Sequence, residues 1–151
     1  MKRSAVVLAL FLASTQAQAL SCLAPDPVTS FHQAANSDDI FHVYHGTFTF
    51  NGQLSDGREV LAVFNGQGLT KDGFVTVPER TISVASRCAA SWCGQYQSGQ
   101  NVLAFVRRTN LGQVFDISPC GNWDFPNPST QTLDAMVGCI SGDACEPNFE
   151  R

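Results

Sequence analysis

The stretch NVLAFVRRTNLGQVFDI, residues 101–117, has the pattern of a β-hairpin. Residues 101–107 and 113–117 are rich in β-branched and aromatic side chains, which favour an extended backbone. Between them, Asn110-Leu111-Gly112 is a turn signal, because Asn and Gly tolerate the backbone angles of tight turns. The sequence therefore predicts two strands joined at residues 110–112.

Three more strands are expected before this hairpin. The segments that predict them are rich in β-branched and aromatic residues and cover residues 40–50, 59–64, and 74–77 together with 80–86. Asn65-Gly66 is expected to end the second of these strands, and Pro78 indicates a bulge or a sheet edge in the third.

Short helices are expected at both ends of the strand region. Pro27 opens the first, over residues 28–35, and Ser129 can cap the second, over residues 129–137. The order of helix, five strands and helix predicts a mainly β fold that closes into a small barrel. The apolar strand residues expected in its core are Val60, Leu61, Val63, Ile82, Val84, Leu103, Phe105, Phe115 and Ile117.

The N-terminus has the three-part layout of a secretory signal peptide. Lys2 and Arg3 precede an apolar run at residues 5–13, and Ala17-Gln18-Ala19 supplies small residues for cleavage. The run is shorter than the about 20 residues that cross a bilayer. We expect cleavage after Ala19. The alternatives are an ordinary N-terminal helix and a lipoprotein cut before Cys22, for which the preceding residues are a poor match.

Cleavage would leave one domain, residues 20–151, behind a signal of residues 1–19. Without Lys2 and Arg3 the domain has 7 basic and 13 acidic residues, a net charge of −6. This acidity argues against nucleic acid or an anionic membrane as a partner. The sequence has no second apolar segment that could insert in a membrane, and Pro128 blocks its one Asn-x-Ser site. We expect a secreted or periplasmic protein, of bacterial origin.

All six cysteines follow the signal, which favours disulfide bonds in an exported chain. Zinc binding is the competing use of such residues. The cysteines form C-x4-C and C-x5-C pairs with no C-x2-C pair, a spacing that favours disulfides over zinc.

The sequence contains no recognised catalytic motif. G-x-S-x-G, H-E-x-x-H, P-loop and G-x-G-x-x-G patterns are all missing. His42 and His45 lie three residues apart on an expected strand, where they would face opposite sides and could not share a metal ion. Asp38-Asp39 is interpreted as a turn. We therefore expect no enzyme activity, no metal and no cofactor.

The cysteine-bearing segments resemble a netrin-like (NTR) domain of the type found in tissue inhibitors of metalloproteinases. Four parts of the chain carry the resemblance: residues 20–27 (LSCLAPDP), residues 31–43, residues 91–94 (SWCG) with 101–105, and residues 117–120 (ISPC) with 136–139 (MVGC). The resemblance implies a five-stranded OB-type barrel with terminal helices packed on it.

The departures from the family pattern imply a disulfide map. Leu20 and His32 stand where the family has cysteines, and the partners of those cysteines would align with Cys93 and Cys139. Each of these has another cysteine close by in the sequence. The resemblance therefore implies the pairs Cys22–Cys120, Cys88–Cys93 and Cys139–Cys145.

The resemblance also implies a binding ridge, in which the N-terminal segment lies beside the turn before the fourth strand. The matching residues are Leu20, Ser21, Cys22, Leu23, Ala90, Ser91 and Trp92. Trp92 is either part of this ridge or a core residue that caps the barrel; the sequence leaves both open. An exported, non-enzymatic binding module with a protein partner is expected. The alternative is a metalloproteinase inhibitor, in which the α-amino and carbonyl groups of Leu20 would bind the zinc of an extracytoplasmic protease. A third reading is an enzyme with an unrecognised site.

Overall fold

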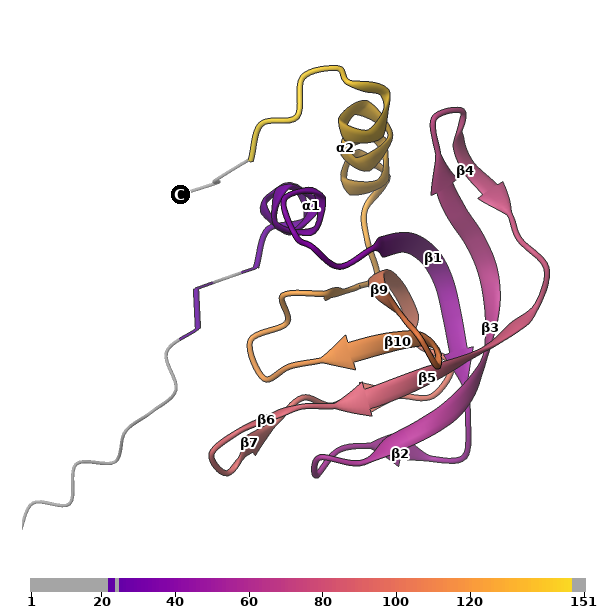
Figure 1. The fold of residues 1–151 in the computed structure, drawn as a ribbon, viewed down its shortest axis with the longest axis vertical. Helices are drawn as coiled ribbons and strands as arrows, with labels where there is room; N and C mark the ends of the chain where they lie inside the picture. The colour runs from indigo at the N-terminus through magenta and orange to yellow at the C-terminus, as the bar shows by residue number, and fades with distance from the viewer. Residues whose placement is uncertain (1–21, 24, 148–151) are drawn as a thin grey trace, which may run out of the picture.

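The computed structural model describes residues 22–23 and 25–147 (Figure 1). Helices stand at the two ends of this region, and the strands lie between them. The elements are α1 (Pro27–Ala35), β1 (Phe41–Thr49), β2 (Gln53–Leu54), β3 (Glu59–Thr70), β4 (Gly73–Thr76), β5 (Arg80–Ser86), β6 (Cys88–Ala89), β7 (Trp92–Cys93), β8 (Tyr96–Gln97), β9 (Asn101–Thr109), β10 (Gly112–Ile117), β11 (Asp124–Pro126) and α2 (Thr130–Ser141).

Five of the strands close into a barrel of OB type. Their order is β1-β3-β5-β10-β9, and β9 pairs back with β1. The closing ladder is antiparallel and runs from the Phe41–Arg107 pair to the Thr47–Asn101 pair. The β5–β10 pair is parallel, and the other barrel pairs are antiparallel. The predicted mainly β, five-stranded barrel with short terminal helices is therefore confirmed.

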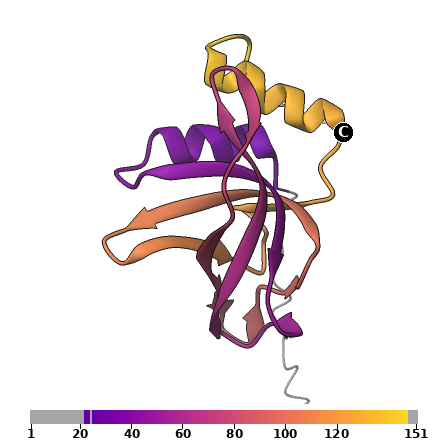
Figure 2. The same ribbon diagram turned by 90° about the vertical axis from the view of Figure 1, so that its right-hand side faces the viewer.

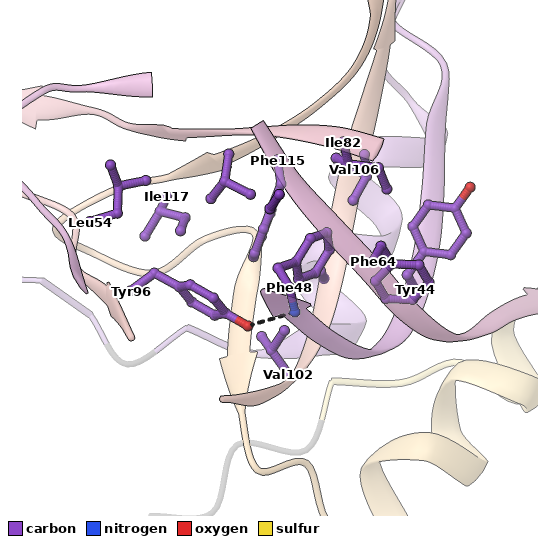
Figure 3. Close-up of a cluster of buried hydrophobic side chains, with 13 residues drawn as sticks. Tyr44, Phe48, Leu54, Phe64, Ile82, Tyr96, Val102, Val106, Phe115 and Ile117 are labelled. Carbon is purple, nitrogen blue, oxygen red and sulfur yellow. Dashed lines mark hydrogen bonds between the residues drawn. The ribbon is translucent and has the colours of Figure 1, made fainter. Parts of the chain in front are cut away.

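Aromatic side chains fill the inside of the barrel (Figure 3). The ring of Phe48 lies 4.9 Å from that of Phe64 and 4.7 Å from that of Phe115, measured between centroids. Tyr96 packs edge-on against Phe48, and its hydroxyl accepts a hydrogen bond from the Phe48 backbone N–H. On each strand every second side chain points into this cluster, as strand geometry requires.

A second apolar layer lies between the barrel and the two helices. Leu103 and Phe105 point outward from β9 and pack with Val28 of α1 and Met136 of α2. Figures 1 and 2 both show the helices together on one side of the barrel. Residues 102–106 of β9 are therefore buried on both faces.

Both helices begin at the residues that the sequence indicated. Asp26 caps α1 by accepting a hydrogen bond from the Thr29 N–H at 2.7 Å. Ser129 caps α2 by accepting from the Thr132 N–H at 3.1 Å. The second helix ends at Ser141, four residues beyond the predicted end, and Gly142 follows it in the left-handed conformation.

Two of the predicted core residues are wrong. Leu61 is 73% exposed and Val63 is 38% exposed, because they lie on the outer face of β3. Val60 is partly buried against the interior cluster. When both faces of a strand are apolar, the sequence does not indicate which face packs into the core. Here the inner face of β3 is filled by Ala62 and Phe64. The remaining predicted core residues are buried.

The predicted strand end at Asn65-Gly66 is also wrong, because β3 continues to Thr70. Gly66 pairs with Gly46 of β1. A Cβ atom on Gly66 would overlap the carbonyl oxygen of His45, and one on Gly46 would overlap that of Asn65. These glycines therefore permit a close crossing of two strands and do not form a turn.

The three disulfides pair as the sequence analysis predicted. They join Cys22 to Cys120, Cys88 to Cys93, and Cys139 to Cys145. His32 donates a hydrogen bond from Nε2 to the Cys145 carbonyl at 2.9 Å, so it holds the segment after α2 against α1. Among the described residues, no helix has both the length and the apolar character needed to span a membrane.

Truncating Phe105 should lower the denaturant concentration at which the domain unfolds. Its side chain is only 1% exposed and is buried between β9 and the helices. We expect Phe105→Ala to lower the free energy of unfolding by about 3–5 kcal/mol. The matched control is Leu61→Ala, on an exposed face, which should change it by less than about 0.5 kcal/mol. Urea titrations followed by circular dichroism measure both values. Equal losses for the two variants would contradict this assignment of the core.

Candidate functional site

The β6–β7 hairpin carries an aromatic side chain at the surface. Cys88 pairs with Cys93 in register and by disulfide, and Ala89 pairs with Trp92. Ala90, with a φ of 54°, lies in the turn between the two strands. The Trp92 side chain is 55% exposed. The alternative in which Trp92 caps the barrel as a core residue is therefore wrong.

The base of this hairpin is fixed to the ends of β5 and β10. The Arg87 N–H donates to the Ile117 carbonyl at 2.7 Å, and the Gly94 N–H donates to the Arg87 carbonyl at 2.9 Å. Ser86 Oγ donates to the Gly94 carbonyl at 2.8 Å. A Cβ atom on Gly94 would overlap the Ile117 carbonyl, so only glycine allows this contact. The hairpin thus leaves the barrel from a rigid base.

The N-terminal segment is attached at the same end of the barrel. Cys22 is bridged to Cys120, which lies three residues after the end of β10. The Leu23 side chain that follows is 92% exposed. Leu20 and Ser21, the first two residues of the predicted ridge, lie outside the described residues.

An open cavity of about 490 Å³ connects these two elements. Cys22 and Leu23 line it from the N-terminal segment, and Cys93 and Gly94 line it from the hairpin. Of the predicted ridge residues that the structure describes, only Cys22 and Leu23 line this cavity. Its described lining does not include Ala90, Ser91 or Trp92, which lie further out on the hairpin.

Two residues that line the cavity each have a buried side-chain oxygen without a hydrogen-bond partner. Ser118 Oγ and Asp124 Oδ1 are both buried without a hydrogen bond, and both residues line the cavity. Burial raises the pKa of the Asp124 carboxyl to about 7, and a hydrogen bond with its own backbone lowers it by less. Asp124 thus titrates near neutral pH. The sequence analysis missed this residue, because a single Asp in β11 has no motif to mark it.

This arrangement favours binding of a hydrogen-bond donor. Ser118 Oγ can donate or accept, and the ionised Asp124 carboxyl only accepts. Among the described lining residues there is no His, Lys or Arg, and the cysteines are bridged. The cavity therefore offers Ser118 no histidine or lysine base and contains no free thiol.

The two strand histidines do not come together. His42 stacks on Tyr44, with ring centroids 6.0 Å apart, whereas His45 meets the Phe74 ring edge-on at 5.9 Å. They lie on opposite faces of β1, as their spacing predicted. Asp38 and Asp39 lie between α1 and β1, where Asp39 approaches Arg107 at 3.8 Å.

Comparison of the chain with protein-family models, with curated proteins and with solved structures gives no significant match. Any assignment of function therefore depends on the geometry of the site and on the sequence segments that resemble NTR domains.

Replacing Asp124 should change how stability depends on pH. Its pKa in the folded protein, about 7, lies above the ordinary value of an Asp, so the folded state retains a proton that the unfolded chain releases. Wild-type stability should therefore fall as pH rises from about 4 to about 7 and then level off. Asp124→Asn should remove this fall, so that at pH 8 the variant resists urea better than the wild type.

The matched control is Asp134→Asn, which removes one negative charge from the exposed surface of α2. Urea midpoints at pH 4, 6 and 8 compare the three proteins. A fall between pH 4 and pH 7 that persists in Asp124→Asn would show that burial of this carboxyl is not its cause.

Proposed function

We propose that this chain is an exported, non-enzymatic binding module of NTR type, which contacts a protein partner through the ridge of Leu20, Ser21, Cys22, Leu23, Ala90, Ser91 and Trp92. The observation that carries the proposal is the exposed Trp92 on a hairpin that is closed by a disulfide and fixed to the barrel.

Trp92 is suited to be the main contact of such a ridge. An aromatic side chain on a rigid hairpin loses little conformational entropy when it binds, and it buries a large apolar area. Tryptophan is enriched among residues that dominate the energy of protein interfaces. Leu23 adds a second exposed apolar side chain beside the cavity.

The cavity beside the ridge indicates what the partner must supply. Asp124 is the one charged side chain in the described lining, and its Oδ1 lacks a hydrogen-bond partner. A lysine, an arginine or an amine from the partner would satisfy it, because a charge-assisted hydrogen bond is stronger than a neutral one. The fitting partner has an apolar surface with one projecting cationic group.

Trp92→Ala should lose the partner while the fold is retained, because Trp92 is exposed and makes no part of the core. We expect an affinity loss of about 30-fold, as for the truncation of an interface residue worth about 2 kcal/mol. The measurement is a pull-down from the exported fraction of the source organism, followed by titration of the captured protein. Leu111→Ala is the control, since Leu111 is also exposed but lies at the opposite end of β10. Equal capture by both variants would rule out the ridge.

Inhibition of a metalloproteinase is the second candidate function. It is favoured by the cavity that Cys22 and Leu23 share with Cys93, because the resemblance implies that these two segments act side by side. In this mechanism the α-amino group of Leu20 would be deprotonated, from an ordinary pKa of about 7.7–8.0, to coordinate the open position of a catalytic zinc.

An extra N-terminal alanine tests the inhibitor mechanism. It would displace the α-amino group from the zinc, so an inhibitory mature domain that begins at Leu20 should lose its inhibition on extension. A panel of zinc proteases with fluorogenic peptides measures this, and mass spectrometry of the exported protein establishes its true first residue. A mature start other than Leu20, or equal inhibition with and without the alanine, contradicts the mechanism.

A further inference from the structure

The end of the barrel opposite the ridge is lined by polar, mostly basic side chains. In β1, β5, β9 and β10, every second side chain faces the barrel interior. At this end of the barrel, the last side chain on the inward face of each of these strands is polar. Their inward residues include Tyr44, Ile82, Val106 and Phe115. Because every second residue shares a face, the next positions outward are His42, Arg80, Arg108 and Gln113. We call these four residues, together with Tyr44, the barrel mouth.

The Tyr44 hydroxyl is the centre of the barrel mouth. It accepts hydrogen bonds from Arg80 Nη1 at 2.9 Å and from Gln113 Nε2 at 3.0 Å. The Arg80 guanidinium also lies 5.5 Å from the centre of the Tyr44 ring. Figure 3 shows the Tyr44 hydroxyl pointing out at one end of the interior cluster, on the far side from Leu54 and Ile117. The guanidinium of Arg80 is thus held in place at the opening.

Arg108 adds a second positive charge at this point, close to His42. Arg108 is directly opposite Gln113 in the β9–β10 ladder, so the two side chains share a face. The pKa of His42 is lowered by burial first, and then by the positive charges of Arg108 and Arg80. Two guanidinium groups therefore act on one imidazole.

Within residues 22–23 and 25–147, neither arginine of the barrel mouth forms an ion pair. The ion pairs of the described residues involve Arg58, Arg87 and Arg107, but neither Arg80 nor Arg108. Asp39, which precedes the closing ladder, lies 3.8 Å from Arg107. Glu79 precedes Arg80 in the segment before β5, is exposed, and forms no ion pair among those found in the described residues. In a predicted mature domain with net charge −6, like charges have been brought together without an opposite charge between them.

We propose that the barrel mouth binds a phosphate group, either as the free ion or as a phosphomonoester. Guanidinium groups are the donors that best match the oxygens of a phosphate, and Arg80 and Arg108 present two of them. The second N–H of the Gln113 side-chain amide supplies a further donor, whereas the Tyr44 O–H donates to Gln113 Oε1 at 3.4 Å. A phosphate carries nearly two negative charges at neutral pH, which matches the two arginines.

Inorganic phosphate is the probe that tests this site. Titration into the ¹⁵N-labelled protein, against sodium chloride at equal ionic strength, should shift the resonances of His42, Arg80, Arg108 and Gln113 with phosphate only. Arg108→Gln should weaken phosphate binding about tenfold, as expected for the loss of one charge-assisted contact. Arg108 is exposed, so the variant should keep its fold, which circular dichroism checks.

Arg58→Gln is the matched control. Arg58 is an exposed arginine paired with Asp56 at the ridge end of the barrel. Its loss should change the affinity by less than about twofold, because a charge beyond the screening length has little effect on the site. Phenyl phosphate forms a second arm: tighter binding than inorganic phosphate indicates a phosphomonoester, and equal or weaker binding indicates the free ion. Equal shifts with chloride, shifts away from the barrel mouth, or equal affinity of Arg108→Gln and wild type would overturn the proposal.

Discussion

The ladder between β1 and β9 is the interaction on which the rest of the structure depends. It closes the sheet on itself, so that a curved five-stranded sheet becomes a barrel without a free edge at this point. It also places β9 between two apolar layers, with the aromatic cluster on one face and the helices on the other. Without this ladder, β9 would not be held against β1, and both apolar layers pack against β9.

Closure also gives the barrel two different ends. At one end, β5 and β10 stop under the hairpin and the N-terminal segment, which two disulfides hold beside the cavity. At the other end, the last inward-facing side chains of four strands are polar and lie around the Tyr44 hydroxyl. The first end has a cavity with one buried carboxyl, and the second has two arginines without an ion pair among the described residues. The proposed protein contact and the proposed phosphate site therefore do not compete for the same surface.

The sequence predicted the barrel strands, the helix starts and the Ser129 cap, because each depends on local pattern, whereas the disulfide pairs followed from the resemblance to NTR domains. It could not predict which face of β3 is covered, because Leu61 and Val63 are as apolar as the residues that fill the barrel. Asn65-Gly66 predicts the end of a strand, since in the sequence a glycine that permits a close crossing looks the same as one that breaks a strand. The barrel mouth could not be predicted from the sequence. Its residues lie far apart in the chain and come together only because of the register in which the strands pair; they are His42, Arg80, Arg108 and Gln113.

The closing ladder has a consequence for the order in which the chain can fold. Phe41 pairs with Arg107, which lies far along the chain. The barrel therefore cannot close until most of the chain is present. Long-range pairing of this kind slows folding, because the entropy of a long loop is lost before the contacts form. If the chain leaves the cytoplasm N-terminus first, β1 and β3 can pair with each other, but their outer edges lack β9 and β5 until those strands have emerged. During that interval the outer side chains Leu61 and Val63 lie on a strand with an open edge, which is the state most prone to aggregation. The interval before the β1–β9 ladder closes is therefore the stage at which aggregation competes most with folding.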